Sequence, residues 1–143
     1  MGYTSILLSS QATHPDFKLV SLEITALFSS FANSLIKRAG LTNLAESRLG
    51  GLEQHIDDLK KEFGSFDFIF FDHDTDLFIP HLLLLEKFGL ITDETIFLAD
   101  NVKFPGAPQY LEFVQKHYQT TLIDTIIDPN IPDILAVSKR KKI

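Results

Sequence analysis

The chain has 143 residues, of which 45% are hydrophobic and 22% charged, so it can bury a core and is not disordered by composition. It carries 13 Lys and Arg against 19 Asp and Glu, a net charge of −6. This acidic balance argues against broad nucleic-acid binding, and the lack of cysteine excludes disulfide frameworks, zinc–thiolate sites and cysteine nucleophiles. No apolar run approaches the roughly 20 residues of a membrane helix and no signal peptide is recognisable. We therefore expect a cytoplasmic protein with one domain, 1–143, that ends in a basic tail, 139–143.

The spacing of apolar residues predicts helices and strands that alternate through the first half of the chain. Four elements are expected there: a helix at 3–12, a strand at 17–24, a helix at 25–38 and a weak strand at 44–49. Thr25 is placed to cap the second helix, and Gly40 is placed to end it. The apolar repeat of this helix predicts one buried face, formed by Leu27, Phe31, Leu35 and Ile36.

The second half continues the alternation and closes with two strands. The expected elements are helices at 52–63, 77–88 and 107–118 and strands at 66–71, 95–99, 120–127 and 133–138. The strand at 66–71 is nearly all apolar, which predicts cover on both faces, and Leu82 to Leu85 are expected to form a buried rib. A turn signal at 128–130 predicts that the last two strands form an antiparallel hairpin. The fold class is therefore α/β, with a mostly parallel sheet.

Acidic side chains stand where three of the predicted strands end. Glu23 closes the first strand, Asp72 follows the strand at 66–71, and Asp100 with Asn101 follows the strand at 95–99. Ligands of open α/β sheets bind beyond these strand ends. Glu23 suits a ribose diol, whereas the oxygens of the other three suit Mg²⁺. The alternative for any single strand-end Asp is a cap on the following helix.

Three segments together carry a family pattern: FIFFDHDTD at 68–76, LLLLEKFGLI at 82–91 and TIFLADNVKFPGAPQYLEFV at 95–114. They resemble catechol O-methyltransferase, and the similarity extends over almost the whole chain. The resemblance implies a Rossmann-like methyltransferase sheet and transfer of a methyl group from S-adenosylmethionine to a catechol hydroxyl held on Mg²⁺. It also implies that this single domain is incomplete, because the family's first strand and N-terminal helices lie upstream of the matched segments.

The resemblance implies a role for each matching residue. Asp72, Asp100 and Asn101 correspond to the metal ligands. The residues that correspond to cofactor contacts are Thr4, Glu23, Ile24, Gly50, Gly51, Leu52, Glu53 and Asp72. Those that correspond to substrate contacts are Asn101, Asp124 and the gate residue Pro105. The implied partner is a small-molecule catechol, with no nucleic acid and no membrane.

The chain departs from the family pattern at functional positions. Thr75 stands where the family has a Lys that acts as general base, and loss of a general base costs roughly 10²–10⁴ in rate. Leu52-Glu53 replaces a Ser-Gln pair, and Asp124 replaces a Glu. The missing strand would lie between the strands at 17–24 and 66–71, so its absence predicts two unpaired sheet edges and self-association through them.

These departures leave several interpretations open. The chain is a fragment of a longer gene product, a diverged paralogue, or a chain that a partner completes. It is either a catechol-type O-methyltransferase of weak activity or a non-catalytic module that keeps the scaffold. The basic tail is either a nuclear or nucleic-acid-binding signal or a solvated end, and the acidic body favours the solvated end.

Overall fold

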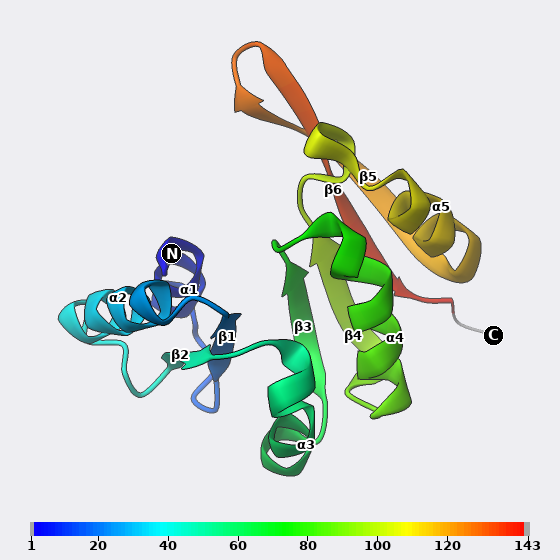
Figure 1. Ribbon diagram of the computed structural model, residues 1–143. Helices are drawn as coiled ribbons and strands as arrows, with labels where there is room; N and C mark the ends of the chain where they lie inside the picture. The colour runs from blue at the N-terminus through cyan, green and yellow to red at the C-terminus, as the bar shows by residue number, and fades with distance from the viewer. Residues whose placement is uncertain (1, 142–143) are drawn as a thin grey trace. The chain divides into compact units, whose positions relative to one another are not determined.

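The computed structural model describes residues 2–141, which divide into two compact units (Figure 1). Unit 1 runs to His55 and unit 2 begins at Ile56. The helix α3 (Leu52–Phe63) has the bounds that the sequence predicts, and it crosses from one unit into the other. Each unit has its own sheet, so each is described separately.

Unit 1 holds a short parallel sheet with two helices. Its elements are α1 (Tyr3–Ser10), β1 (Leu19–Glu23), α2 (Ala26–Arg38) and β2 (Ala45–Leu49). The strands pair in register from Leu19 opposite Ala45 to Glu23 opposite Leu49. Their carboxyl ends therefore lie side by side, as the sequence predicts for a parallel sheet. Gly40 follows α2 with a φ of 73°, a left-handed conformation that ends the helix.

The buried face of α2 agrees with the predicted one only in part, because Ile36 is buried and Leu35 half-buried while the other two predicted residues are exposed. Ser29, Ala32 and Ile36 are buried, whereas Leu27 is 72% exposed and Phe31 is 51% exposed. The reason is that α2 turns polar side chains toward β2, where hydrogen bonds fix its rotation. Thr25 occupies the N-cap position of α2, as predicted, but its side chain makes no capping hydrogen bond.

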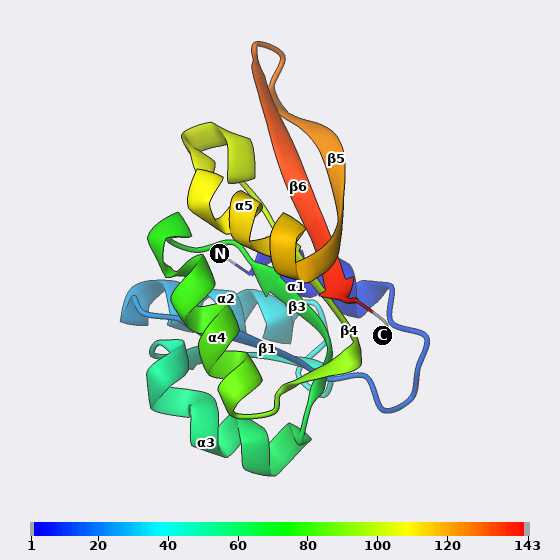
Figure 2. The same ribbon diagram turned by 90° about the vertical axis from the view of Figure 1, so that its right-hand side faces the viewer.

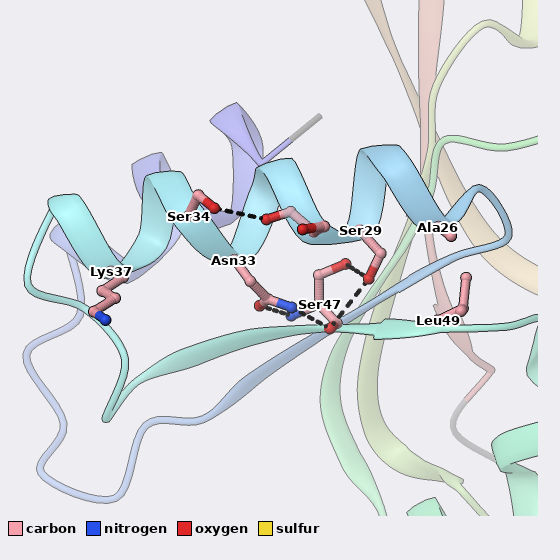
Figure 3. A pocket seen from close by; sticks show the side chains of 8 residues that line it. Ala26, Ser29, Asn33, Ser34, Lys37, Ser47 and Leu49 are labelled. Carbon is pink, nitrogen blue, oxygen red and sulfur yellow. Dashed lines mark hydrogen bonds between the residues drawn. The ribbon is translucent and has the colours of Figure 1, made fainter.

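Asn33 holds α2 against the edge of β2 (Figure 3). Its Nδ2 donates to the Ser47 carbonyl at 2.8 Å, and its Oδ1 accepts from the Ser47 N–H at 2.8 Å. This amide takes the two backbone bonds that a further strand would make with Ser47, so it blocks strand pairing at this position. Ser29, Ser34 and Lys37 line the open groove beside it, whose volume is about 540 Å³.

Unit 2 holds a four-stranded mixed sheet in the order β3-β4-β6-β5. Its strands are β3 (Phe66–Phe71), β4 (Ile91–Ala99), β5 (Tyr118–Asp128) and β6 (Ile131–Arg140). Its complete helices are α4 (Phe78–Lys87) and α5 (Pro108–His117), with short helical turns at Thr75–Leu77 and Val102–Gly106. β3 and β4 are parallel, and β6 is antiparallel to β4 and β5. The predicted C-terminal antiparallel hairpin is therefore confirmed.

The core of unit 2 lies between one face of this sheet and the helices α4 and α5, which stand on the same side of the strands (Figure 2). The ring of Phe71 contacts those of Phe78 and Tyr110, with centroids 5.7 and 6.3 Å away. On the opposite face, Phe68 is 44% exposed and Ile96 is 43% exposed. The prediction that β3 is covered on both faces is therefore wrong.

The predicted leucine rib is also only partly buried. Leu82 and Leu85 are buried in α4, while Leu83 is 46% exposed. A helix turns by about 100° per residue, so four consecutive side chains cannot share one face.

The hairpin of β5 and β6 runs past the end of its neighbour (Figure 1). The pairing of β4 with β6 stops at Ala99 opposite Ala136, so the part nearer the turn has two strands only. Arg140, in the predicted basic tail, belongs to β6 and forms ion pairs with Glu86 and Asp93 at 3.4 and 3.5 Å. Positions 142 and 143 of that tail lie outside the described residues.

Two strands of the described chain, β1 in unit 1 and β3 in unit 2, have a strand partner on one side only. Within residues 2–141, β1 has β2 as its single strand partner and β3 has β4 as its single strand partner. Each strand therefore has one edge without a strand on it, as predicted from the sequence.

Candidate functional site

Two carboxylates meet at the carboxyl ends of β3 and β4. Phe71 and Ala99 are the last paired residues of these strands, and Asp72 and Asp100 follow them directly. The Asp100 N–H donates to the Phe71 carbonyl at 3.0 Å, which continues the ladder by one residue. The parallel arrangement thus places the two acidic residues on neighbouring strand ends, as the sequence predicts.

The electrostatics of this pair favour a cation. Asp72 is exposed as a residue, yet partial desolvation of its carboxyl raises its pKa, and the negative charge of Asp100 raises it further. One oxygen of the Asp100 carboxylate accepts from the Asn101 N–H at 2.8 Å, which fixes its orientation. The two ionised carboxylates repel each other, and a divalent cation bound between them would offset this repulsion.

Asn101 is the third candidate ligand, and its backbone is unusual. It has a φ of 59° and a ψ of 29°, the left-handed conformation that Asn adopts more readily than most residues. Its Nδ2 donates to Oδ2 of Asp133 at 3.0 Å, so its carbonyl oxygen lies on the other side of the amide. Among residues 2–141 no group of three His, Cys, Asp or Glu is arranged to hold a metal. A hard cation at this site therefore needs the Asn101 oxygen beside Asp72 and Asp100, and this donor set fits Mg²⁺.

Asp133 is a residue that sequence reasoning missed. It lies in the extended part of β6, is 1% exposed, and accepts from the N–H groups of Lys103 and Phe104 at 3.0 Å each. Burial alone would raise the pKa of Asp133. Its carboxylate also accepts hydrogen bonds from the Ile134 N–H and from Asn101, and together the four hydrogen bonds outweigh burial and lower the pKa. The sequence carries a weak signal, because Asp133 is an acid at the first position of a predicted strand, and a buried charge is rare without a partner.

Other predicted residues of unit 2 lie nearby in the chain but contribute less. Thr75 begins a helical turn and lines a cavity of about 170 Å³ with Gly106 and Tyr110. Pro105 is exposed in the turn Val102–Gly106. Asp124 is exposed on β5 opposite Ile134, and no hydrogen bond described for residues 2–141 joins it to the Asp72–Asp100 pair. The roles of these residues remain predictions.

A histidine pair anchors the segment that follows Asp72. Nδ1 of buried His81, in α4, lies 2.8 Å from Nε2 of His73, and the two rings stack with centroids 4.7 Å apart. In this contact one ring nitrogen donates and the other accepts. The contact fixes the chain after β3 onto α4.

The predicted cofactor residues belong to unit 1, except Asp72, which belongs to unit 2. The Gly50 N–H donates to the Glu23 carbonyl at 3.0 Å, and one Glu23 carboxylate oxygen accepts from the Thr25 N–H at 2.9 Å. Gly50 has a φ of 132°, and a Cβ there would lie 2.9 Å from Nε2 of His55, so only glycine fits. The remaining predicted residues are half-buried Thr4 in α1, exposed Ile24, the turn residue Gly51, buried Leu52 and exposed Glu53.

Comparison with known proteins identifies the family. Residues 1–125 match the O-methyltransferase family. The chain belongs to this family. The O-methyltransferase chain is 34% identical over 116 residues to catechol O-methyltransferase of Bos taurus, a match that covers 80% of the chain and 42% of that protein. It is 33% identical over 116 residues to catechol O-methyltransferase of Sus scrofa, covering 80% of the chain and 62% of that protein. It thus spans about two fifths to three fifths of the length of these relatives.

Solved structures confirm the α/β methyltransferase fold. An O-methyltransferase from Bacillus cereus in complex with SAH has a TM-score of 0.80 at 20% identity, over 97% of this chain and 70% of that one. An O-methyltransferase from Streptomyces achromogenes in complex with SAM has a TM-score of 0.81 at 22% identity, over 99% and 69%. Within residues 2–141 of the O-methyltransferase chain, no helix is long and apolar enough to cross a bilayer.

Proposed function

We propose that the protein containing this chain transfers a methyl group from S-adenosylmethionine to one hydroxyl of a catechol-type substrate held on Mg²⁺. The observation that carries the proposal is the Asp72–Asp100 pair at adjacent strand ends, where the backbone N–H of Asn101 donates to the Asp100 carboxylate. Membership of the O-methyltransferase family and the names of the relatives support the reaction class. The two neighbours named as SAH and SAM complexes support the cofactor.

The chemistry of the site suits this reaction. Methyl transfer from a sulfonium is an in-line displacement, so catalysis depends on positioning and on neutralising charge. A bound divalent cation would supply a lower phenol pKa and a fixed orientation of both hydroxyls. The carboxylates of Asp72 and Asp100 would provide its charge balance, and the Asn101 oxygen would provide a neutral third ligand. Glu23 in unit 1 provides a carboxylate suited to the ribose hydroxyls of the cofactor.

Binding and turnover test the proposal directly. Calorimetry should detect heat when S-adenosylmethionine or MgCl₂ is added to the folded chain, and methylation of catechol should require Mg²⁺ and cease with EDTA. Phenol is the matched substrate control, because it has one hydroxyl and cannot chelate the cation. A folded sample that gives no heat with either ligand would contradict the proposal.

A variant pair separates the site from general effects of charge. Asp72→Asn removes a ligand and should abolish Mg²⁺ binding, whereas Asp67→Asn makes the same change at an exposed position of β3 and should leave binding intact. Equal losses in both variants would contradict the assignment of Asp72.

A second candidate function is a non-catalytic module that keeps the scaffold, and Thr75 favours it. A threonine hydroxyl cannot act as a base at neutral pH, and Thr75 stands where the family resemblance implies a lysine. Thr75→Lys distinguishes the two. A rise in catechol methylation of roughly 10²-fold or more supports a damaged enzyme. No turnover in the folded variant supports the binding module.

A further inference from the structure

We infer that Asp133 is a positioning residue that fixes the flip of the Asn101 amide, so that the amide oxygen and not the nitrogen faces the cation site. The inference rests on the proposed function, because it assigns a role at the proposed metal site. It concerns Asp133 alone, to which the family resemblance gave no role. All the residues that carry it belong to unit 2.

The first step is the orientation of Asn101. A side-chain amide can rotate by 180° and exchange its oxygen for its nitrogen, and only the oxygen is a ligand for a hard cation. An ionised carboxylate can only accept hydrogen bonds, so the amide atom that faces Oδ2 of Asp133 at 3.0 Å must be the nitrogen. The oxygen of Asn101 is thereby turned away from Asp133.

The second step is the rigidity of Asp133 itself. Its other oxygen, Oδ1, accepts from two backbone N–H groups, those of Lys103 and Phe104, at 3.0 Å each. A backbone N–H can only donate a hydrogen bond, so these two groups hold the carboxylate in one orientation. Because the side chain is 1% exposed, water does not compete for these bonds.

The third step is the backbone that the carboxylate clamps. Asn101 is the one non-glycine residue with positive φ among residues 2–141, and the helical turn Val102–Gly106 follows it directly. Asp133 bonds to Asn101, Lys103 and Phe104, so it spans this turn from the opposite strand. The extension of β6 beyond the end of β4 is what brings Asp133 there.

Asp133→Asn tests the inference because it keeps the shape of the side chain and replaces one accepting carboxylate oxygen with a donating NH₂ group. Two N–H groups hold the new amide oxygen at Oδ1, so its NH₂ group faces Asn101 and forces that amide to flip. The nitrogen of Asn101 then faces the cation, and Mg²⁺ affinity should fall by roughly 10–100-fold, the usual cost of losing a residue that orients a ligand. Calorimetry with MgCl₂ measures the change without any turnover.

Asn101→Asp in the Asp133→Asn background should restore most of the lost affinity. A carboxylate at 101 has an acceptor for the new NH₂ group and still offers an oxygen to the cation. A purely structural role for Asp133 would not predict this rescue. Asp128→Asn, at an exposed position of the same hairpin, is the matched control and should bind Mg²⁺ like the unmodified chain.

The outcomes separate the two proposals. If the unmodified folded chain binds no Mg²⁺, the metal part of the proposed function fails, and this inference fails with it. If the unmodified chain binds Mg²⁺ and Asp133→Asn binds it equally well, only this inference is overturned.

A nuclear magnetic resonance measurement on the unmodified chain decides the matter should Asp133→Asn not fold. Side-chain Hδ2 protons of Asn101 should show Overhauser contacts to the Asp133 Hβ protons, with and without Mg²⁺. Absence of these contacts would overturn the inference.

Discussion

Replacement of Tyr110 by phenylalanine should stabilise the protein. The Tyr110 side chain is 1% exposed, and its hydroxyl is a buried polar group without a hydrogen-bond partner among the described residues. Burial raises the pKa of Tyr110, so the hydroxyl stays protonated and cannot relieve its cost by ionising. Tyr110→Phe removes this hydroxyl and keeps the ring contacts with Phe71 and Phe78, whose centroids lie 6.3 and 5.2 Å away.

The magnitude follows from the two effects of removing one oxygen. An unpaired buried hydroxyl costs about 1–3 kcal/mol, and this cost disappears. The lost dispersion contacts of a single atom offset it by only about 0.5–1 kcal/mol, at roughly 0.1–0.2 kcal/mol per contact. The free energy of unfolding should therefore rise by up to about 2.5 kcal/mol, as measured by urea denaturation followed by far-ultraviolet circular dichroism.

Tyr118→Phe is the matched control, because Tyr118 lies in the same core but its hydroxyl has a hydrogen-bond partner. Burial and then a hydrogen bond to Glu86 raise the pKa of Tyr118. Loss of a bond to a charged group should lower the free energy of unfolding by about 1.5–3 kcal/mol. The reasoning is refuted if Tyr110→Phe destabilises the protein as much as Tyr118→Phe does, since both hydroxyls would then have partners.

Two further predictions concern the candidate site and unit 1. Burial, and to a lesser degree the charge of Asp100, raises the pKa of Asp72 above its ordinary 3.8. In the metal-free chain, the contribution of Asp72 to the free energy of unfolding therefore falls as the pH rises from 3.8 through the raised pKa. Asp72→Asn should remove this dependence and stabilise the metal-free chain at pH 7, which urea denaturation at several pH values measures; an unchanged pH profile would contradict it. Asn33→Ala unpairs two backbone groups of Ser47 and should destabilise unit 1 by about 2 kcal/mol, with faster hydrogen exchange at Ser47. Ser34→Ala, exposed on the same helix, should change stability by less than about 0.5 kcal/mol, and equal effects would contradict the role of Asn33.

The sequence was most informative where a local rule decides the outcome. The bounds of α3 and β3 follow from apolar periodicity and glycine positions, and the structure reproduces them residue for residue. The placement of Asp72 and Asp100 at adjacent strand ends follows from parallel topology. Family membership followed from short motifs of fixed spacing, which the match over residues 1–125 confirms.

The tertiary structure decided which faces are buried and which polar groups meet. Periodicity predicts that a helix has a buried face, but the rotation of α2 depends on the bonds that Asn33 makes with Ser47 of the following strand, β2. The exposure of Phe68 depends on what covers the second face of β3. An apolar run in the sequence does not predict that cover.

The contact between Asp133 and Asn101 joins residues separated by 32 positions. It depends on how far the hairpin extends beyond β4, a property of strand register. The sequence by itself determined the element types, the strand-end acids and the family. Only the tertiary structure decided how those acids are oriented, because long-range packing and hydrogen bonding set side-chain orientation.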